Sequence, residues 1–282
     1  MTSKIYLGTI LGTDGYYYKG VFKLNLLKVA ESDSYGGSIN ALALDDNYIY
    51  VGGGTTNKVY RLNKLNLSKV AESTDYGGEI RALAQDNNYI YVGGENTKKV
   101  YKLNKSDLSK VAESTGYGGE IRALALDDNY IYVGGGTTNK VYKLNKSNLS
   151  KVAESDNYGG AIYALAQDDD FVYVGGATTR KVYKLNKSDL SKVAESDNYG
   201  GTIYALAQDD NYIYVGGHTT QKVYKLNKSN LSKVAESDDY GGHINALAQD
   251  DNYIIYVGGG GGTRVYKYEG NLYTLAGYRR VE

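Results

Sequence analysis

The residues best suited to chemistry in this 282-residue chain are the tyrosines of a repeated Tyr-Gly-Gly triplet. The triplets begin at Tyr35, Tyr76, Tyr117, Tyr158, Tyr199 and Tyr240. A tyrosine ring offers an apolar face to the C–H groups of a sugar, while adjacent Asp or Asn side chains and open glycine backbone can bind its hydroxyl groups. The pattern therefore predicts repeated glycan-binding sites. In the alternative, each ring wedges between structural units and the glycines only supply the positive φ of a turn.

The residues on either side of the isoleucine in the apolar run after each triplet differ between copies, although the turn between the first and second apolar runs and the connection between the third and fourth are nearly constant. The position after the isoleucine is occupied, in chain order, by Asn40, Arg81, Arg122, Tyr163, Tyr204 and Asn245. The loop after each "YVGG" also varies and contributes His218, and His243 precedes the isoleucine of the following copy. Such differences are typical of a ligand-binding surface, or of drift in loops that tolerate change.

Two of the variable arginines come with a glutamate two positions earlier. Glu79 precedes Arg81, and Glu120 precedes Arg122. Residues two apart on a strand point to the same side of a sheet. Each Glu and Arg therefore either form an ion pair or offer charged contacts to a ligand.

The remaining reactive groups do not form a catalytic or metal-binding pattern. Consecutive acids such as those at 168–170 lack the spaced ligands and closing Glu of a calcium loop and are typical turn residues. The two histidines have no convincing third metal ligand. Every acid and hydroxyl recurs with the repeat, so no single Ser-His-Asp set or oriented general base stands out. We expect no cofactor, no metal site and no enzyme activity.

Composition restricts the partners. Lys plus Arg and Asp plus Glu number 32 each, so there is no basic excess for binding nucleic acid. Cysteine is absent, which excludes disulfides and thiolate chemistry. The N-terminus does not resemble a secretory signal, and no apolar stretch of roughly 18 residues occurs. We expect a soluble chain without membrane insertion, and its compartment and oligomeric state are not specified by the sequence.

All of these residues sit in a unit that recurs with a constant step. The string "YVGG" begins at Tyr50, returns every 41 residues up to Tyr214, and comes again at Tyr256 after one added isoleucine. Within residues 162–196, the runs "IYALAQD", "FVYVGG", "KVYKLNK" and "LSKVAES" are rich in Val, Ile and Tyr and are bounded by turn residues. Four strands in about 40 to 45 residues predict one blade of a β-propeller.

Seven such units fit the chain, so we predict an all-β, seven-bladed β-propeller of four-stranded antiparallel blades in a single domain. The units span approximately 3–34, 35–75, 76–116, 117–157, 158–198, 199–239 and 240–282. In the altered first unit, the strands are expected at "KIYLGTI", "DGYYYKG", "VFKLN" and "LLKVAES", with shortened connections. The ring would close by packing the last blade on the first. The alternative is six blades with an N-terminal appendage.

The unit is similar in strand order and turn placement to the blades of WD-repeat and related bacterial and phage propellers. The resemblance rests on "YGG", "ALA", "YVGG", "KVYKL" and "SKVA". The Gly-His and Trp-Asp dipeptides of WD repeats are missing, and "VYKLN" stands in place of Trp-Asp. The resemblance implies the fold and a platform for a partner. Lectin-type propellers of the tachylectin kind give a functional analogy, because they repeat weak sites for avidity.

The order of the strands places the variable residues on one face. In an antiparallel blade, the connections between blades and the loops after the second strand share a face, which we expect to bind a glycan or protein partner. The acidic turns lie on the other face with the lysine of "LNKS", which balances their charge. We predict a non-enzymatic, lectin-like binding or adhesion module. The alternative is a structural component of a phage particle or cell-surface appendage, or a near-consensus propeller without a ligand.

Overall fold

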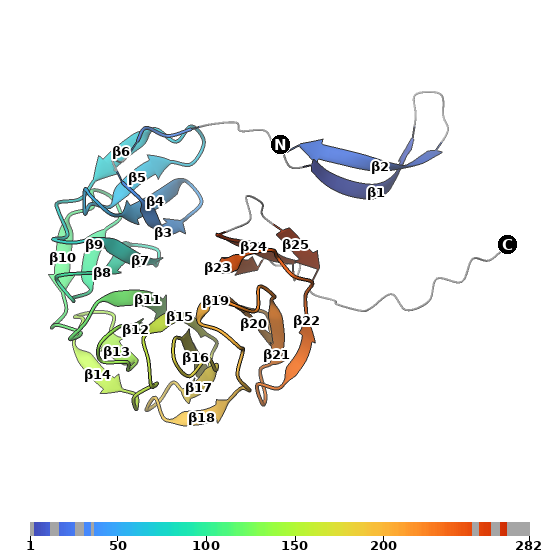
Figure 1. Cartoon of the computed structure of the whole chain (residues 1–282). Helices are drawn as coiled ribbons and strands as arrows, with labels where there is room; N and C mark the ends of the chain where they lie inside the picture. The colour runs from blue at the N-terminus through green and yellow to red at the C-terminus, as the bar shows by residue number, and fades with distance from the viewer. Residues whose placement is uncertain are drawn as a thin grey trace.

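The computed structural model of the chain describes residues 3–11, 17–25, 31–34, 37–249, 254–260 and 266–269. Every regular element within these residues is a β-strand. Figure 1 shows the sheets arranged one after another around a common axis. The all-β prediction and the repetition of antiparallel blades are therefore confirmed.

Five sheets have four antiparallel strands that pair in sequence order. The first blade contains β3 (Ile39–Leu44), β4 (Tyr48–Gly53), β5 (Tyr60–Asn63) and β6 (Lys69–Glu72). The second contains β7 (Ile80–Gln85), β8 (Tyr89–Gly94), β9 (Tyr101–Asn104) and β10 (Lys110–Glu113). The third contains β11 (Ile121–Leu126), β12 (Tyr130–Gly135), β13 (Tyr142–Asn145) and β14 (Lys151–Glu154).

The remaining blades continue the same order. The fourth contains β15 (Ile162–Gln167), β16 (Phe171–Gly176), β17 (Tyr183–Asn186) and β18 (Lys192–Glu195). The fifth contains β19 (Ile203–Gln208), β20 (Tyr212–Gly217), β21 (Tyr224–Asn227) and β22 (Lys233–Glu236). The sixth sheet has three described strands, β23 (His243–Gln249), β24 (Ile254–Gly260) and β25 (Tyr266–Glu269).

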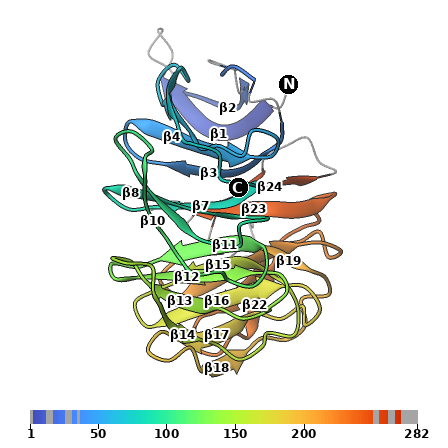
Figure 2. The same ribbon diagram turned by 90° about the vertical axis from the view of Figure 1, so that its left-hand side faces the viewer.

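The first strand of each blade lies nearest the axis, and the fourth lies on the outside (Figure 1). Neighbouring inner strands contact one another from β3 through β7, β11, β15 and β19 to β23. Figure 2 shows the same sheets from the side, stacked face against face. Residues at the same position of successive inner strands are therefore neighbours in space.

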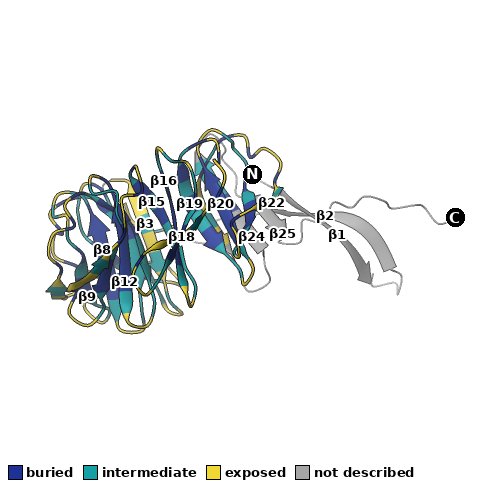
Figure 3. Ribbon diagram, turned by 90° about the horizontal axis from the view of Figure 1, so that it is seen from below, coloured by how far each residue is buried: buried dark blue, intermediate teal, exposed yellow. Residues whose placement is uncertain are grey.

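Burial explains why the middle strands are apolar along their whole length. Ile131, Tyr132 and Val133 of β12 are almost inaccessible, because a blade covers each side of the sheet. The outer strand β14 instead exposes Val152 and both charged ends. Figure 3 shows this division between buried middle strands and accessible loops and edges.

Each blade packs on the next through a glycine whose missing side chain leaves room for an isoleucine of the following blade, and we call this glycine position the seat. Ile162 of β15 packs against Gly134 of β12 so closely that a Cβ on the glycine would lie 2.5 Å from Cγ2 of the isoleucine. Real Cβ atoms do not approach this closely, so the position requires glycine. The same contact recurs at five junctions, which pair Gly52 with Ile80, Gly93 with Ile121, Gly134 with Ile162, Gly175 with Ile203, and Gly216 with Ile244.

Adjacent blades are also linked by an aspartate in the first turn of the blade, between its first and second strands. These turns lie on the face opposite the Tyr-Gly-Gly connections. Asp45 accepts hydrogen bonds from the backbone N–H groups of Asn47 and Tyr48 at 3.0 and 2.8 Å and from the hydroxyl of Tyr50 at 3.0 Å. Lys105 of the next blade places its Nζ 3.1 Å from the same carboxylate. Equivalent ion pairs join Lys146 to Asp86, Lys187 to Asp127, and Lys228 to Asp168. The expected charge balance on this face is confirmed.

The predicted count of seven four-stranded blades is not reached in the described residues. The first unit forms a separate two-stranded sheet of β1 (Ser3–Leu11) and β2 (Tyr17–Asn25). Residues 17–20 of the strand predicted at "DGYYYKG" and the strand predicted at "VFKLN" form one continuous strand, β2, which pairs with β1 from end to end. No residue separates Gly20 from Val21, and a hairpin turn needs about two residues, so the chain cannot fold back there.

Other parts of the blade assignment lie outside the described residues. They are most of the fourth strand predicted for the first unit, the last strand predicted for the final unit, and Tyr35. The structure thus has five complete blades and a three-stranded sixth sheet.

The seat predicts a large effect from a single methyl group. Gly134→Ala should destabilise the fold by about 1–3 kcal/mol, because the added carbon overlaps Ile162 and forces the blades apart. The matched control is Gly136→Ala, whose Cβ would meet only the side chain of Glu120, with the closest atom at 3.0 Å. Urea unfolding measures both, and equal stabilities for the two variants would contradict the seat.

The aspartate predicts a specific acid sensitivity. Burial raises the pKa of Asp45, but hydrogen bonds from Tyr48, Asn47, Lys105 and Tyr50 outweigh it and lower the pKa from 3.8 to about 2. A carboxyl group with a lowered pKa stabilises the fold above its unfolded pKa, and this contribution disappears as the pH falls from about 4 to 2. Asp45→Asn should therefore reduce the loss of unfolding free energy over this window by about 2 kcal/mol. The exposed neighbour variant Asp46→Asn should follow the wild-type profile, and parallel profiles for all three proteins would refute the assignment.

Candidate functional site

The structure places the described Tyr-Gly-Gly tyrosines in the core between blades. Tyr158 is 3% exposed and meets Tyr183 edge-on, with ring centroids 4.7 Å apart. Its hydroxyl donates to the backbone carbonyl of Lys181 at 2.5 Å, and burial raises its pKa to about 12. The same burial holds for Tyr76, Tyr117, Tyr199 and Tyr240. These rings do not present an open face to a ligand in this structure.

The glycines of the triplet are used for the turn. Gly159 has a φ of +94°, a conformation that favours glycine, and its N–H donates to the side chain of Asn157 at 2.7 Å. Gly160 faces the next loop, where a Cβ would come 2.6 Å from the carbonyl oxygen of Ala177. The geometry agrees with the wedge-and-turn alternative.

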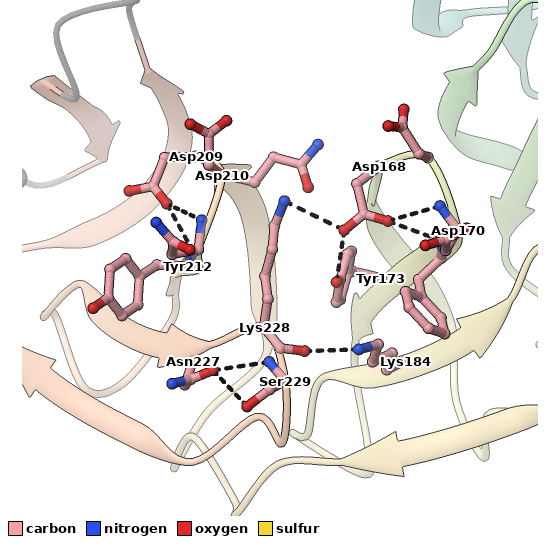
Figure 4. Close-up of a pocket in the computed structure, with 14 residues that line it drawn as sticks. Asp168, Asp170, Tyr173, Lys184, Asp209, Asp210, Tyr212, Asn227, Lys228 and Ser229 are labelled. Carbon is pink, nitrogen blue, oxygen red and sulfur yellow. Dashed lines mark hydrogen bonds and ion pairs between the residues drawn. The ribbon is translucent and has the colours of Figure 1, made fainter.

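A polar pocket lies on the opposite face, between the fourth and fifth blades (Figure 4). It has a volume of about 860 Å³ and is lined by acids of both first turns, including Asp168 and Asp209. Lys228 reaches across it to Asp168 at 3.3 Å, and Lys184 donates to the backbone carbonyl of Lys228 at 2.8 Å. These two lysine contacts link the fourth and fifth blades, and similar pockets recur at other junctions. Oε1 of Gln208, which also lines the pocket, has no hydrogen-bond partner among the described residues.

The sequence analysis did not single out the lysine in the middle of "KVYKLN", although a charged residue in an apolar run of every copy was a usable signal. Lys184 is buried with its Nζ 3.7 Å from the ring centroid of Phe171. Burial lowers its pKa. The equivalent lysines Lys102, Lys143 and Lys225 lie over tyrosine rings in the same way.

Variable residues of four inner strands and of the loop after β20 come together on the other face. The guanidinium of Arg122 lies 4.7 Å from the ring centroid of Tyr163. Tyr163 meets Tyr204 edge-on at 5.1 Å, and Tyr204 lies 6.5 Å from His218. His218 stacks on His243 with ring centroids 3.7 Å apart. We call these five residues the rim cluster, which crosses four successive blades in one line of contacts.

The charged end of the rim cluster is neutralised by its own glutamate. Arg122 donates from Nε to Glu120 at 2.6 Å, and both side chains keep about a quarter of their surface accessible. One blade earlier, Arg81 pairs with Glu79 at 2.9 Å and with Glu95. The ion-pair alternative for these residues is therefore observed. The last two predicted residues, Asn40 and Asn245, are exposed at the two ends of the series of inner strands.

The two histidines of the rim cluster differ in the hydrogen bonding of their ring nitrogens. Nδ1 of His218 lies 3.1 Å from the hydroxyl of Thr219. Nδ1 of His243 is buried without a hydrogen-bond partner among the described residues. The described part of the chain contains no group of three or more His, Cys, Asp or Glu side chains placed to hold a metal ion.

Comparison with known proteins supports the fold alone. No protein-family model and no curated protein matches the sequence. The computationally designed Ika8 protein has 19% identity and a TM-score of 0.71, covering 86% of this chain and 74% of its own. The structure of U3-55K has 14% identity and a TM-score of 0.76, covering 84% and 79% respectively. The chain thus has a propeller-like repeat fold. Among its described residues there is no helix able to cross a membrane.

Tyr158 and Tyr163 should differ in their contribution to stability, because Tyr158 is buried between blades and Tyr163 is partly exposed in the rim cluster. Tyr158→Ala should cost about 3–5 kcal/mol, because it empties a buried ring site, whereas Tyr163→Ala should cost about 1 kcal/mol, the loss of a partly exposed aromatic contact. Urea unfolding of both variants measures the difference. Equal costs would show that the two tyrosines have the same structural role.

Proposed function

We propose that this chain is a non-enzymatic binding module that takes a neutral, hydroxyl-rich ligand such as a glycan at the rim cluster. The observation that carries the proposal is the placement of the variable residues. Residues copied in every blade form the seats, the wedges and the ion pairs, whereas the residues that differ form one contact line. A fold requirement explains the first group and does not explain the second.

The chemistry of the rim cluster suits a sugar. Tyr163 and Tyr204 are partly accessible and supply ring surface for C–H groups. The Arg122–Glu120 pair supplies donors and acceptors without net charge, which favours hydroxyl groups over an ionic ligand. His218 adds an exposed ring nitrogen at the far end.

A glycan array followed by calorimetry on the best ligands tests this function. Tyr163→Ala with Tyr204→Ala should weaken binding at least about tenfold, or 1.4 kcal/mol, because both ring contacts are lost. The control Asp128→Ala changes an exposed residue of a first turn on the opposite face and should leave affinity unchanged. Absence of binding to any glycan at millimolar concentration would contradict the proposal.

A second candidate is a scaffold or assembly component, and the outer strands favour it. Each of the five outer strands exposes a valine at its second position, from Val70, 45% exposed, to Val234, 54% exposed. Adjacent lysine–glutamate pairs, such as Lys151–Glu154 at 2.7 Å, place charges on the same strands and oppose edge-to-edge pairing. A protein partner on this outer belt would bind independently of the rim cluster.

A further inference from the structure

The glycine–isoleucine contact that joins adjacent blades is incomplete at both ends of the described series. There the first blade has a free isoleucine, and the sixth sheet has a free glycine. At every internal junction an isoleucine of an inner strand fills the seat above a glycine of the preceding blade. The isoleucines Ile80, Ile121, Ile162, Ile203 and Ile244 are all 0% exposed. The Cβ position of the glycine lies 3.1 to 3.2 Å from the isoleucine Cβ at all five junctions. The junction is therefore a repeated fit with fixed geometry.

The first blade has the isoleucine, but no sheet in the described part of the chain receives it. Ile39 is 51% exposed, and Leu42 and Leu44 on the same strand are 59% and 56% exposed. At internal junctions the leucine equivalent to Leu42 also contacts the seat, as Leu83 does with its Cδ1 3.4 Å from the Cβ position of Gly52. One apolar strand face at the start of the series is thus uncovered. Monomeric proteins rarely leave such contiguous patches open without a partner.

The sixth sheet has the seat but no isoleucine. Gly258 of β24 stands where Gly216 stands in β20, and no atom of the described residues lies within 4 Å of its Cβ position. Its neighbour Val257 is fully buried, as the equivalent Val215 is in β20. Figure 1 shows that the first blade and the sixth sheet face each other across the opening of the arc.

We propose that Ile39 of the first blade enters the empty seat at Gly258, so that the chain closes into a six-bladed ring on its own last sheet. We call this contact between the first blade and the sixth sheet the seam. Its isoleucine and glycine are the residue types of the five internal junctions, so the sixth sheet is the specific partner of the exposed face of the first blade.

The seat glycine of each internal junction pairs across its sheet with an alanine, as Gly216 does with Ala205, and Gly258 pairs with Ala246 in the same way. The β1–β2 sheet lacks this pairing, because Gly20 lies opposite Gly8, so we do not take it as that partner. It is then an appendage outside the ring.

Closure also completes the rim. Equivalent positions of adjacent inner strands contact each other, as Tyr163 and Tyr204 do. The closed seam therefore places Asn245 beside Asn40, and the variable residues form an unbroken circle. A ligand that contacts both asparagines would bind the closed ring better and shift the population toward it.

Engineered cysteines test the seam cleanly, because the chain has no cysteine of its own. The test pair is Ile39→Cys with Gly258→Cys in the full chain. The matched positive control is Ile80→Cys with Gly52→Cys, whose Cβ separation of 3.1 Å is close to the roughly 3.5–4.5 Å of disulfides. Ile39→Cys alone is the negative control. Non-reducing gels after mild oxidation separate links within one chain from links between chains.

The expected result is a reductant-reversible link within one chain, formed by the test pair to at least half the yield of the control pair and independent of protein concentration. Dimers or longer ladders would overturn the proposal and make a second copy the occupant of the seat. Absence of any link while the control pair forms one would also overturn it.

A measurement without cysteines covers the case in which the double variant does not fold. In the closed ring Ile39 is buried, so Ile39→Ser should lower the melting temperature by several degrees. Leu65→Ser, at a site 91% exposed, is the matched control and should have no effect. An unchanged melting temperature for both variants would overturn closure through Ile39.

Discussion

The contact between a side-chain-free glycine and the isoleucine of the next blade is the constraint on which the rest of the structure depends. It lets two sheets approach until the isoleucine fills the space that a Cβ would need. The approach sets the spacing of the inner strands, and that spacing brings residues 41 positions apart into ring contact. The rim cluster exists because the seats hold β11, β15, β19 and β23 side by side.

The two faces of the molecule have different tasks. On the face of the acidic turns, the first-turn aspartate of each of the first four blades binds its own turn, its own tyrosine and the lysine of the next blade, as Asp45 does, so a substitution would disturb three partners. Since each blade contacts only its neighbours, the same residues are needed at every junction. On the other face, Arg122 or Tyr163 can occupy the same inner-strand position, because neither side chain is enclosed.

Much of the fold could be predicted from the sequence, since the 41-residue step and four apolar runs per step specify the blade. Strand geometry placed Glu120 and Arg122 on the same side of the sheet, but their pairing was one of two alternatives that the sequence left open. The merging of two predicted strands into β2 was missed, although the absence of residues between Gly20 and Val21 contained the reason. The burial of Tyr158 could not be decided, because a tyrosine beside glycines suits a sugar site and a core wedge equally. The contacts of the rim cluster could not be predicted from the sequence, because they depend on how adjacent blades are placed relative to one another.

Our proposal assigns function to the differences between copies, and making the copies alike tests it most directly. The variant Tyr163→Arg with Tyr204→Arg gives both positions the residue that Arg81 and Arg122 carry, so the inner strands remain of a natural type. Wild type and variant would be compared by melting temperature and on the same glycan array. We expect the melting temperature to fall by only a few degrees, because the contact between Tyr163 and Tyr204 is lost, and we expect the wild-type glycan signals to disappear. Retained signals, or a variant that no longer folds, would contradict it.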